Sequence, residues 1–241
     1  MAVNIVVVLT QSIGYRAKLT VEYGRFGRPA IPVDPNCVAS FDKAVDWVNT
    51  KLGSGLSPNE FSWDVSRVAV TDIMPPGLSG LSMFGAFAAA LLQESVQKGM
   101  ARKDAMRCGS YCLLDDLLNA CLSNIAISAQ PGAKVVGELD RVGGIDRKIE
   151  ALCRPGIRNP CCVLAWNQRR PLTWLIEQWD SARRRWTPVK ANAEPRIHEI
   201  WHVPQMQAPL PVIRAWDAMD AILHVFDLQC SGIARRIVPY L

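Results

Sequence analysis

The sequence predicts an α+β domain, because strand-like and helix-like runs alternate along the chain and a hairpin pattern opens it. Residues 5–9 (IVVVL) and 18–22 (KLTVE) are rich in β-branched residues and flank a turn at Gly14, which is typical of a β-hairpin. No internal repeat or linker divides the 241 residues. We therefore expect a single domain over residues 1–241.

The next elements follow from hydrophobic spacing and from helix end signals. Residues 40–52 carry apolar side chains at helical spacing, with Ser40 as a natural N-cap and Gly53 as a stop. Residues 67–71 (RVAVT) resemble a strand. Residues 80–92 (GLSMFGAFAAALL) predict a helix that is apolar or small on every side, which places it in the centre of the fold.

The second half of the chain continues the alternation. We expect a helical region at 99–123, strands at 124–128, 134–139 and 161–165, helices at 145–153, 171–186 and 216–227, and a strand or short helix at 196–203.

Composition excludes several classes of protein. The net charge of +5 comes from scattered basic residues, densest at 183–185, which indicates a solvated face and not a nucleic-acid-binding surface. The eight cysteines lack the paired C-x-x-C of structural zinc sites, and we expect no cofactor. Because no basic leader or apolar run of membrane length is present, we expect a cytoplasmic protein that does not engage a membrane.

A first candidate site is the segment PPGLSG at residues 75–80, where Ser79 lies on a turn that leads into the apolar helix. Backbone N–H groups of such a turn and helix start can stabilise an oxyanion. Ser79 is therefore a candidate nucleophile. The alternative is that it only caps the helix.

A second candidate site is the segment VGGIDRKIEAL at residues 142–152. Its glycine pair allows a tight turn, and Lys148 then lies at the margin of the apolar stripe of the following helix. A lysine held against an apolar face can lose its proton near neutral pH and serve as a general base for a serine. The alternative is a lysine whose ammonium group reaches solvent.

Together the two segments resemble the signature segments of Lon proteases, whose nucleophile opens a small-residue helix and whose base is the lysine of a G-G-x-x-x-K segment. The resemblance implies a Lon-type fold of the ribosomal protein S-five domain-two-like superfamily. It implies peptide-bond hydrolysis by a Ser79–Lys148 dyad through an acyl-enzyme, with Ser128 of the segment AISA supporting the lysine. The glycines of the two motifs that resemble the family's are Gly77, Gly80, Gly143 and Gly144.

The chain also departs from the Lon pattern. Leu78 replaces the proline before the nucleophile, and the spacing implies helical insertions at 98–123 and 167–195. No G-x-x-x-x-G-K-[ST] segment is present, so an ATPase partner would act in trans or be dispensed with. The resemblance further implies a protein or peptide substrate and a homo-oligomer.

Three other interpretations stay open. A catalytically silent Lon-like module would serve assembly or partner binding. His198 and His202 satisfy H-E-x-x-H, the pattern of a zinc peptidase, although on a strand they would lie too far apart to share a metal. The glycine-rich residues 75–82 also resemble the phosphate-binding loop of GHMP small-molecule kinases.

Overall fold

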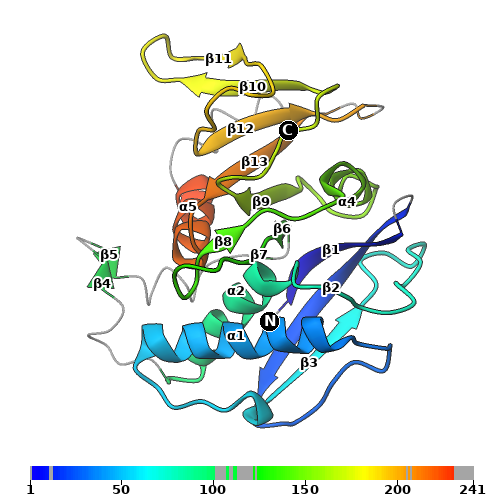
Figure 1. Cartoon of the computed structure of the whole chain (residues 1–241), viewed down its shortest axis with the longest axis vertical. Helices are drawn as coiled ribbons and strands as arrows, with labels where there is room; N and C mark the ends of the chain where they lie inside the picture. The colour runs from blue at the N-terminus through cyan, green and yellow to red at the C-terminus, as the bar shows by residue number, and fades with distance from the viewer. Residues whose placement is uncertain are drawn as a thin grey trace.

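The computed structural model describes residues 2–10, 13–100, 107–108, 111–112, 122, 124–204, 206 and 208–230. In this part of the chain, the fold is built on a nine-stranded mixed sheet with the order β11-β10-β12-β13-β9-β6-β1-β2-β3 (Figure 1). Its strands are β1 (Ala2–Thr10), β2 (Ile13–Tyr23), β3 (Phe61–Ser66), β6 (Ile125–Ser128), β9 (Cys161–Ala165), β10 (Leu175–Asp180), β11 (Arg185–Pro188), β12 (His198–His202) and β13 (Leu210–Ala215).

The four central strands β13, β9, β6 and β1 are parallel, and the outer strands pair antiparallel. Parallel strands are normally covered on both faces, which explains their nearly continuous apolar sequences. Small hairpins pair β4 (Arg107–Cys108) with β5 (Tyr111–Cys112) and β7 (Gln130–Pro131) with β8 (Leu139–Asp140). The structure is thus a mixed α/β fold with a large mixed sheet, in agreement with the expected α+β class.

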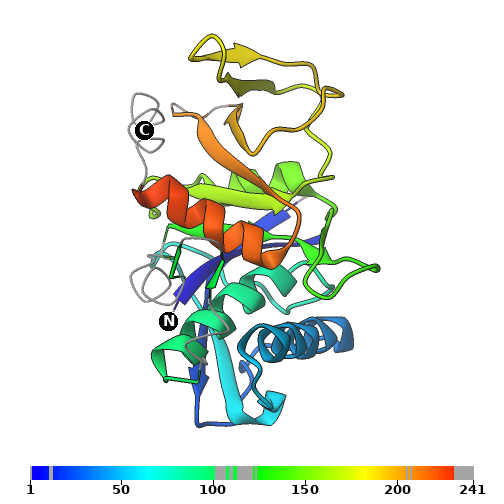
Figure 2. The same ribbon diagram turned by 90° about the vertical axis from the view of Figure 1, so that its left-hand side faces the viewer.

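Helices cover both faces of the sheet. On one face lie α1 (Pro35–Leu52), α2 (Phe84–Gln97) and α5 (Ala218–Cys230), and Figure 2 shows them one beside the next. The other face is covered by α4 (Ile145–Leu152). A single-turn helix at Pro58–Glu60 precedes β3. No helix in the described residues is long and apolar enough to cross a membrane.

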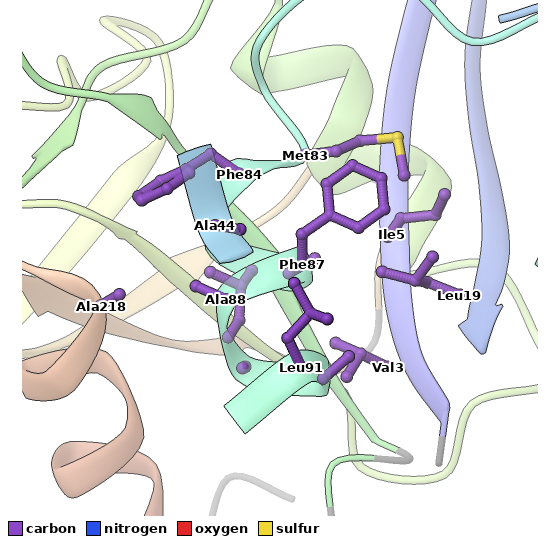
Figure 3. Close-up of a cluster of buried hydrophobic side chains, with 14 of the residues drawn as sticks. Val3, Ile5, Leu19, Ala44, Met83, Phe84, Phe87, Ala88, Leu91 and Ala218 are labelled. Atoms are coloured by element: carbon purple, nitrogen blue, oxygen red, sulfur yellow. The ribbon is translucent and has the colours of Figure 1, made fainter. Parts of the chain in front are cut away.

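The core is divided by the sheet into two layers because neighbouring strand residues point to opposite faces. Val3 and Ile5 of β1 pack toward α2, where Phe87 and Leu91 fill the space between helix and sheet (Figure 3). Val6, which follows Ile5 along the strand, packs instead toward α4. The prediction of a central apolar helix is confirmed, because every residue of α2 from 84 to 96 is buried.

Several expected elements begin or end elsewhere. α1 begins at Pro35, with the Asp34 carboxylate accepting from the Cys37 N–H, so Ser40 lies inside the helix and not at its N-cap. The cap signal Asp-Pro was present in the sequence. The strand expected at 67–71 lies at Phe61–Ser66, where alternate residues are buried, whereas Val70 is exposed. The strand expected at 134–139 is reduced to β8.

The helix predicted at 171–186 was wrong, because this segment forms the hairpin of β10 and β11. β10 pairs with β12 on its other side, and its buried residues Ile176 and Gln178 alternate along the strand. Long-range pairing with β12 therefore decided the conformation. The segment 167–195 extends the sheet instead of adding a helix. Most of the expected helical insertion at 98–123 lies outside the described residues, and the described parts at 107–108 and 111–112 form the short strands β4 and β5 and not a helix.

Candidate functional site

The second sequence motif forms the start of α4. Gly144 occupies the N-cap position with a φ of 62°, a left-handed conformation that favours glycine. Ile145, Ile149 and Leu152 then face the sheet. Lys148 lies among them and is only 4% exposed, so it is inside the apolar layer and not at its margin.

The Lys148 side chain ends beside the last residue of β6. Its Nζ donates to the Ser128 Oγ at 3.3 Å, and Ser128 is itself buried. No carboxylate lies within ion-pair distance of Lys148 in the described part of the chain. Burial lowers the pKa of Lys148 to about 8, and the neighbouring Cys162 thiol opposes this only in part.

This arrangement has a chemical consequence. An amine with a pKa of about 8 is neutral in a substantial fraction of molecules at slightly alkaline pH. A neutral lysine can accept a proton from a hydroxyl, which an exposed lysine rarely does at such a pH. The structure thus brings the Lys148 amine and the Ser128 hydroxyl together.

Ser79 lies on the loop before α2 and is exposed. The loop is fixed through its neighbour Leu78, whose N–H donates to the Pro32 carbonyl and whose carbonyl accepts from the Asp34 N–H. α2 begins at Phe84, five residues later, so Ser79 does not cap this helix.

The backbone N–H beside Ser79 is already engaged. Gly80 has a φ of 77°, and its N–H donates to the two oxygens of the Asp34 carboxylate at 3.3 and 3.1 Å. This N–H is therefore unavailable to an oxyanion or a phosphate while Asp34 holds it, which disfavours a phosphate-binding loop here. Asp34 was missed by sequence reasoning, although its position before Pro35 marks it as a capping residue.

The two motifs lie on opposite faces of the sheet. Leu78 and Met83 pack into the layer of α1 and α2, whereas Lys148 and Ser128 belong to the face covered by α4. No hydrogen bond joins the Ser79 hydroxyl to the Lys148 amine within the described residues. Contact between them requires the loop 75–83 to change its conformation, so the Ser79–Lys148 dyad stays a prediction.

The glycines of the two sequence motifs differ in their surroundings. A Cβ at Gly77 would lie 3.1 Å from the Pro32 carbonyl oxygen, so this glycine allows the loop to approach its neighbour closely. A Cβ at Gly143 would meet nothing within 4 Å. Gly143 and Gly144 line a cavity of about 1000 Å³ at the start of α4.

The H-E-x-x-H segment is strand β12, and its glutamate is part of a buried ion network. Glu199 accepts from Arg170 at 2.7 Å and from Arg214 at 3.0 Å. Burial raises the pKa of Glu199, but the two guanidinium groups outweigh this and hold it below its usual value. A carboxylate paired in this way is poorly suited to act as a general base.

The two histidines of that segment are separated along the strand. His202 contacts the Glu177 carboxylate at 2.9 Å, and His198 lies beside the ring of His224. Among the described residues, no group of three or more histidine, cysteine or acidic side chains is placed to hold a metal ion. The geometry of β12 therefore gives the zinc interpretation no support.

Comparison with known proteins adds no family assignment. No protein-family model matches this sequence, and no characterised protein matches it at a significant level.

Proposed function

We propose that this protein is a Lon-like serine peptidase of the ribosomal protein S-five domain-two-like superfamily, in which Lys148 is the general base. One observation carries the proposal: Lys148 is buried without a carboxylate partner, and its pKa is lowered to about 8. Burying an unpaired lysine costs stability, so a purely structural role gives no reason to keep it. A perturbed pKa next to a hydroxyl is typical of catalytic bases.

The proposed reaction is an acyl transfer in two steps. The Ser79 Oγ attacks the peptide carbonyl carbon, while the Lys148 amine takes the hydroxyl proton and passes it to the leaving nitrogen as the C–N bond breaks. A water molecule then attacks the resulting ester and gives a proton to the same amine, which passes it to the Ser79 Oγ as the ester C–O bond breaks. Ser128 holds the amine in place through its hydroxyl.

For Ser79 to reach Lys148, the loop must leave the position that Asp34 stabilises. Release of Asp34 would also free the Gly80 N–H for the oxyanion of the tetrahedral intermediate. Substrate binding, self-association or an ATPase partner could supply the free energy for this change, since Lon-type domains generally work as rings. Light scattering at tens of micromolar protein, with and without peptide, tests for the homo-oligomer.

The peptidase proposal is tested with fluorogenic peptides and an unfolded protein as substrates, in the presence of a chelator. Ser79→Ala and Lys148→Gln should each abolish turnover, and the double variant should be no worse than either, because the two residues act as a unit. Ser82→Ala, in the same loop, is the matched control and should retain activity. The rate should rise with pH around a midpoint near 8, as Lys148 loses its proton.

The activities of these variants distinguish the possible roles of Ser79, Ser82 and Lys148. Activity that survives Ser79→Ala but is lost in Ser82→Ala would move the nucleophile to Ser82. Full activity in Lys148→Gln would remove the lysine as base and with it the proposed mechanism.

A second candidate is a non-catalytic Lon-like module for assembly or partner binding. It is favoured by the exposed position of Ser79 and by the engagement of the Gly80 N–H with Asp34. If the wild-type chain does not react with serine-directed acylating probes, alone or with an ATPase, this candidate becomes the better account.

A further inference from the structure

The cavity at the start of α4 lies at the edge of the sheet where β6 and β9 end. Gln130, two residues beyond β6, and Gln168, three residues beyond β9, both line it. Ligands of sheets with parallel strands commonly bind at the carboxyl ends of those strands. Its volume of about 1000 Å³ is at the upper end for small-molecule pockets, so several residues of an extended peptide fit.

The acidic groups of this cavity are largely engaged within the protein. The Asp140 carboxylate accepts from the Asn167 Nδ2 at 2.7 Å and from the Gln130 Nε2 at 3.2 Å. Glu150 pairs with Arg147 at 2.9 Å. The remaining carboxylate of the lining is Asp146, which is exposed in the first turn of α4.

The arginines that line the cavity are not paired with carboxylates to the same extent. Arg141 and Arg169 line the cavity, are exposed, and make no ion pair with another described residue. Arg170, also in the lining, belongs to the buried network in which one carboxylate, Glu199, faces two guanidinium groups, the second from Arg214. This network therefore carries a net positive charge next to the cavity.

The same cavity offers apolar contacts and open space. The Leu172 side chain is 89% exposed, and Trp174 is partly buried beside it in the lining. Gly143 does not adopt a left-handed φ, so its own backbone does not require glycine. The open space where its Cβ would project is available for the close approach of a ligand backbone.

We propose that this cavity is a substrate subsite for acidic peptide segments in which an aspartate or glutamate neighbours an apolar side chain. The carboxylate pairs with Arg141 and Arg169, the apolar group contacts Leu172 and Trp174, and the peptide backbone passes over Gly143. This inference rests on the proposed peptidase function for the role of the cavity as a substrate subsite, because Lys148 lies on α4, whose first residues line the cavity.

The test is equilibrium binding of two fluorescently labelled peptides, one with Glu-Leu pairs and one with Gln-Leu pairs of the same length. Fluorescence anisotropy is measured with the wild type before hydrolysis can proceed. It is also measured with Lys148→Gln, whose fold is checked by circular dichroism. The acidic peptide should bind about tenfold more tightly, the difference expected for one well-formed charged hydrogen bond. The binding measurement needs no turnover, so a failure of the subsite and a failure of the peptidase proposal give different results.

Three variants within the cavity and one control outside it localise the effect. Arg141→Gln and Arg169→Gln should each remove most of the preference for the acidic peptide. Gly143→Ala should weaken both peptides without changing the melting temperature, because its Cβ meets no protein atom. Arg158→Gln removes one exposed positive charge outside the cavity and should leave binding unchanged.

Equal binding of the two peptides, or an equal loss with Arg158→Gln, would overturn the subsite. Arginine-dependent binding without any hydrolysis would leave a binding site for acidic peptides and would remove the peptidase proposal. Hydrolysis of peptides without tighter binding of the acidic peptide would support the peptidase proposal and remove the acidic subsite.

Discussion

Replacing Lys148 with methionine should stabilise the folded protein at neutral pH while removing the proposed base. The ordinary pKa of a lysine is 10.5, whereas burial lowers that of Lys148 to about 8. At pH 7 the amine is mostly protonated in both states, so the folded state carries the full cost of the buried charge. That cost is about 3 kcal/mol, from the difference between the two pKa values.

Methionine has a similar length and no charge, so it removes this cost. It also leaves the buried Ser128 hydroxyl without its partner, which costs about 1 kcal/mol. We therefore expect Lys148→Met to raise the free energy of unfolding by about 2 kcal/mol at pH 7.

The dependence on pH gives the sharper test. The folded-state pKa is lowered, so between pH 8 and 10.5 the unfolded chain binds the proton that the folded chain has released, and wild-type stability rises with pH. The advantage of the variant should shrink by about 1 kcal/mol between pH 7 and pH 9.

Urea unfolding of both proteins at the two pH values measures this difference. The exposed Lys190→Met is the matched control and should change stability little at either pH. A Lys148→Met variant that loses several kcal/mol at pH 7, with no dependence on pH, would show that Lys148 is a well-paired ammonium group and would refute the argument.

Two further predictions concern the framework of the site. Glu199→Gln should lower the free energy of unfolding by about 3–5 kcal/mol, because it leaves Arg170 and Arg214 buried without a counter-charge; an unchanged urea midpoint would contradict this. Gly14→Ala should cost about 1–3 kcal/mol, since its Cβ would lie 2.1 Å from the carbonyl oxygen of Arg147 in α4. Thermal unfolding followed by circular dichroism tests the second change, and a melting temperature equal to that of the wild type would contradict it.

Part of the candidate site could be predicted from sequence. The turn before α4 follows from the glycine pair, and the apolar stripe beside Lys148 follows from residues three and four positions apart. The full burial of Lys148 could not be predicted, because it depends on β1 and β2 packing against the helix and on Ser128 of β6 lying at its amine. The contact between Asp34 and Gly80, 46 residues apart, likewise depends on how two loops meet.

The sequence by itself determined the alternation of strands and helices, the opening hairpin and the central position of α2. These features depend on the spacing of apolar residues that are close in the sequence, and this spacing can be read directly from the chain. Only the tertiary structure decided that residues 175–188 form strands, because pairing with β12 overrides the local pattern. Only the tertiary structure separated Ser79 from Lys148, since which face of the sheet a loop or helix covers is set by packing between distant segments.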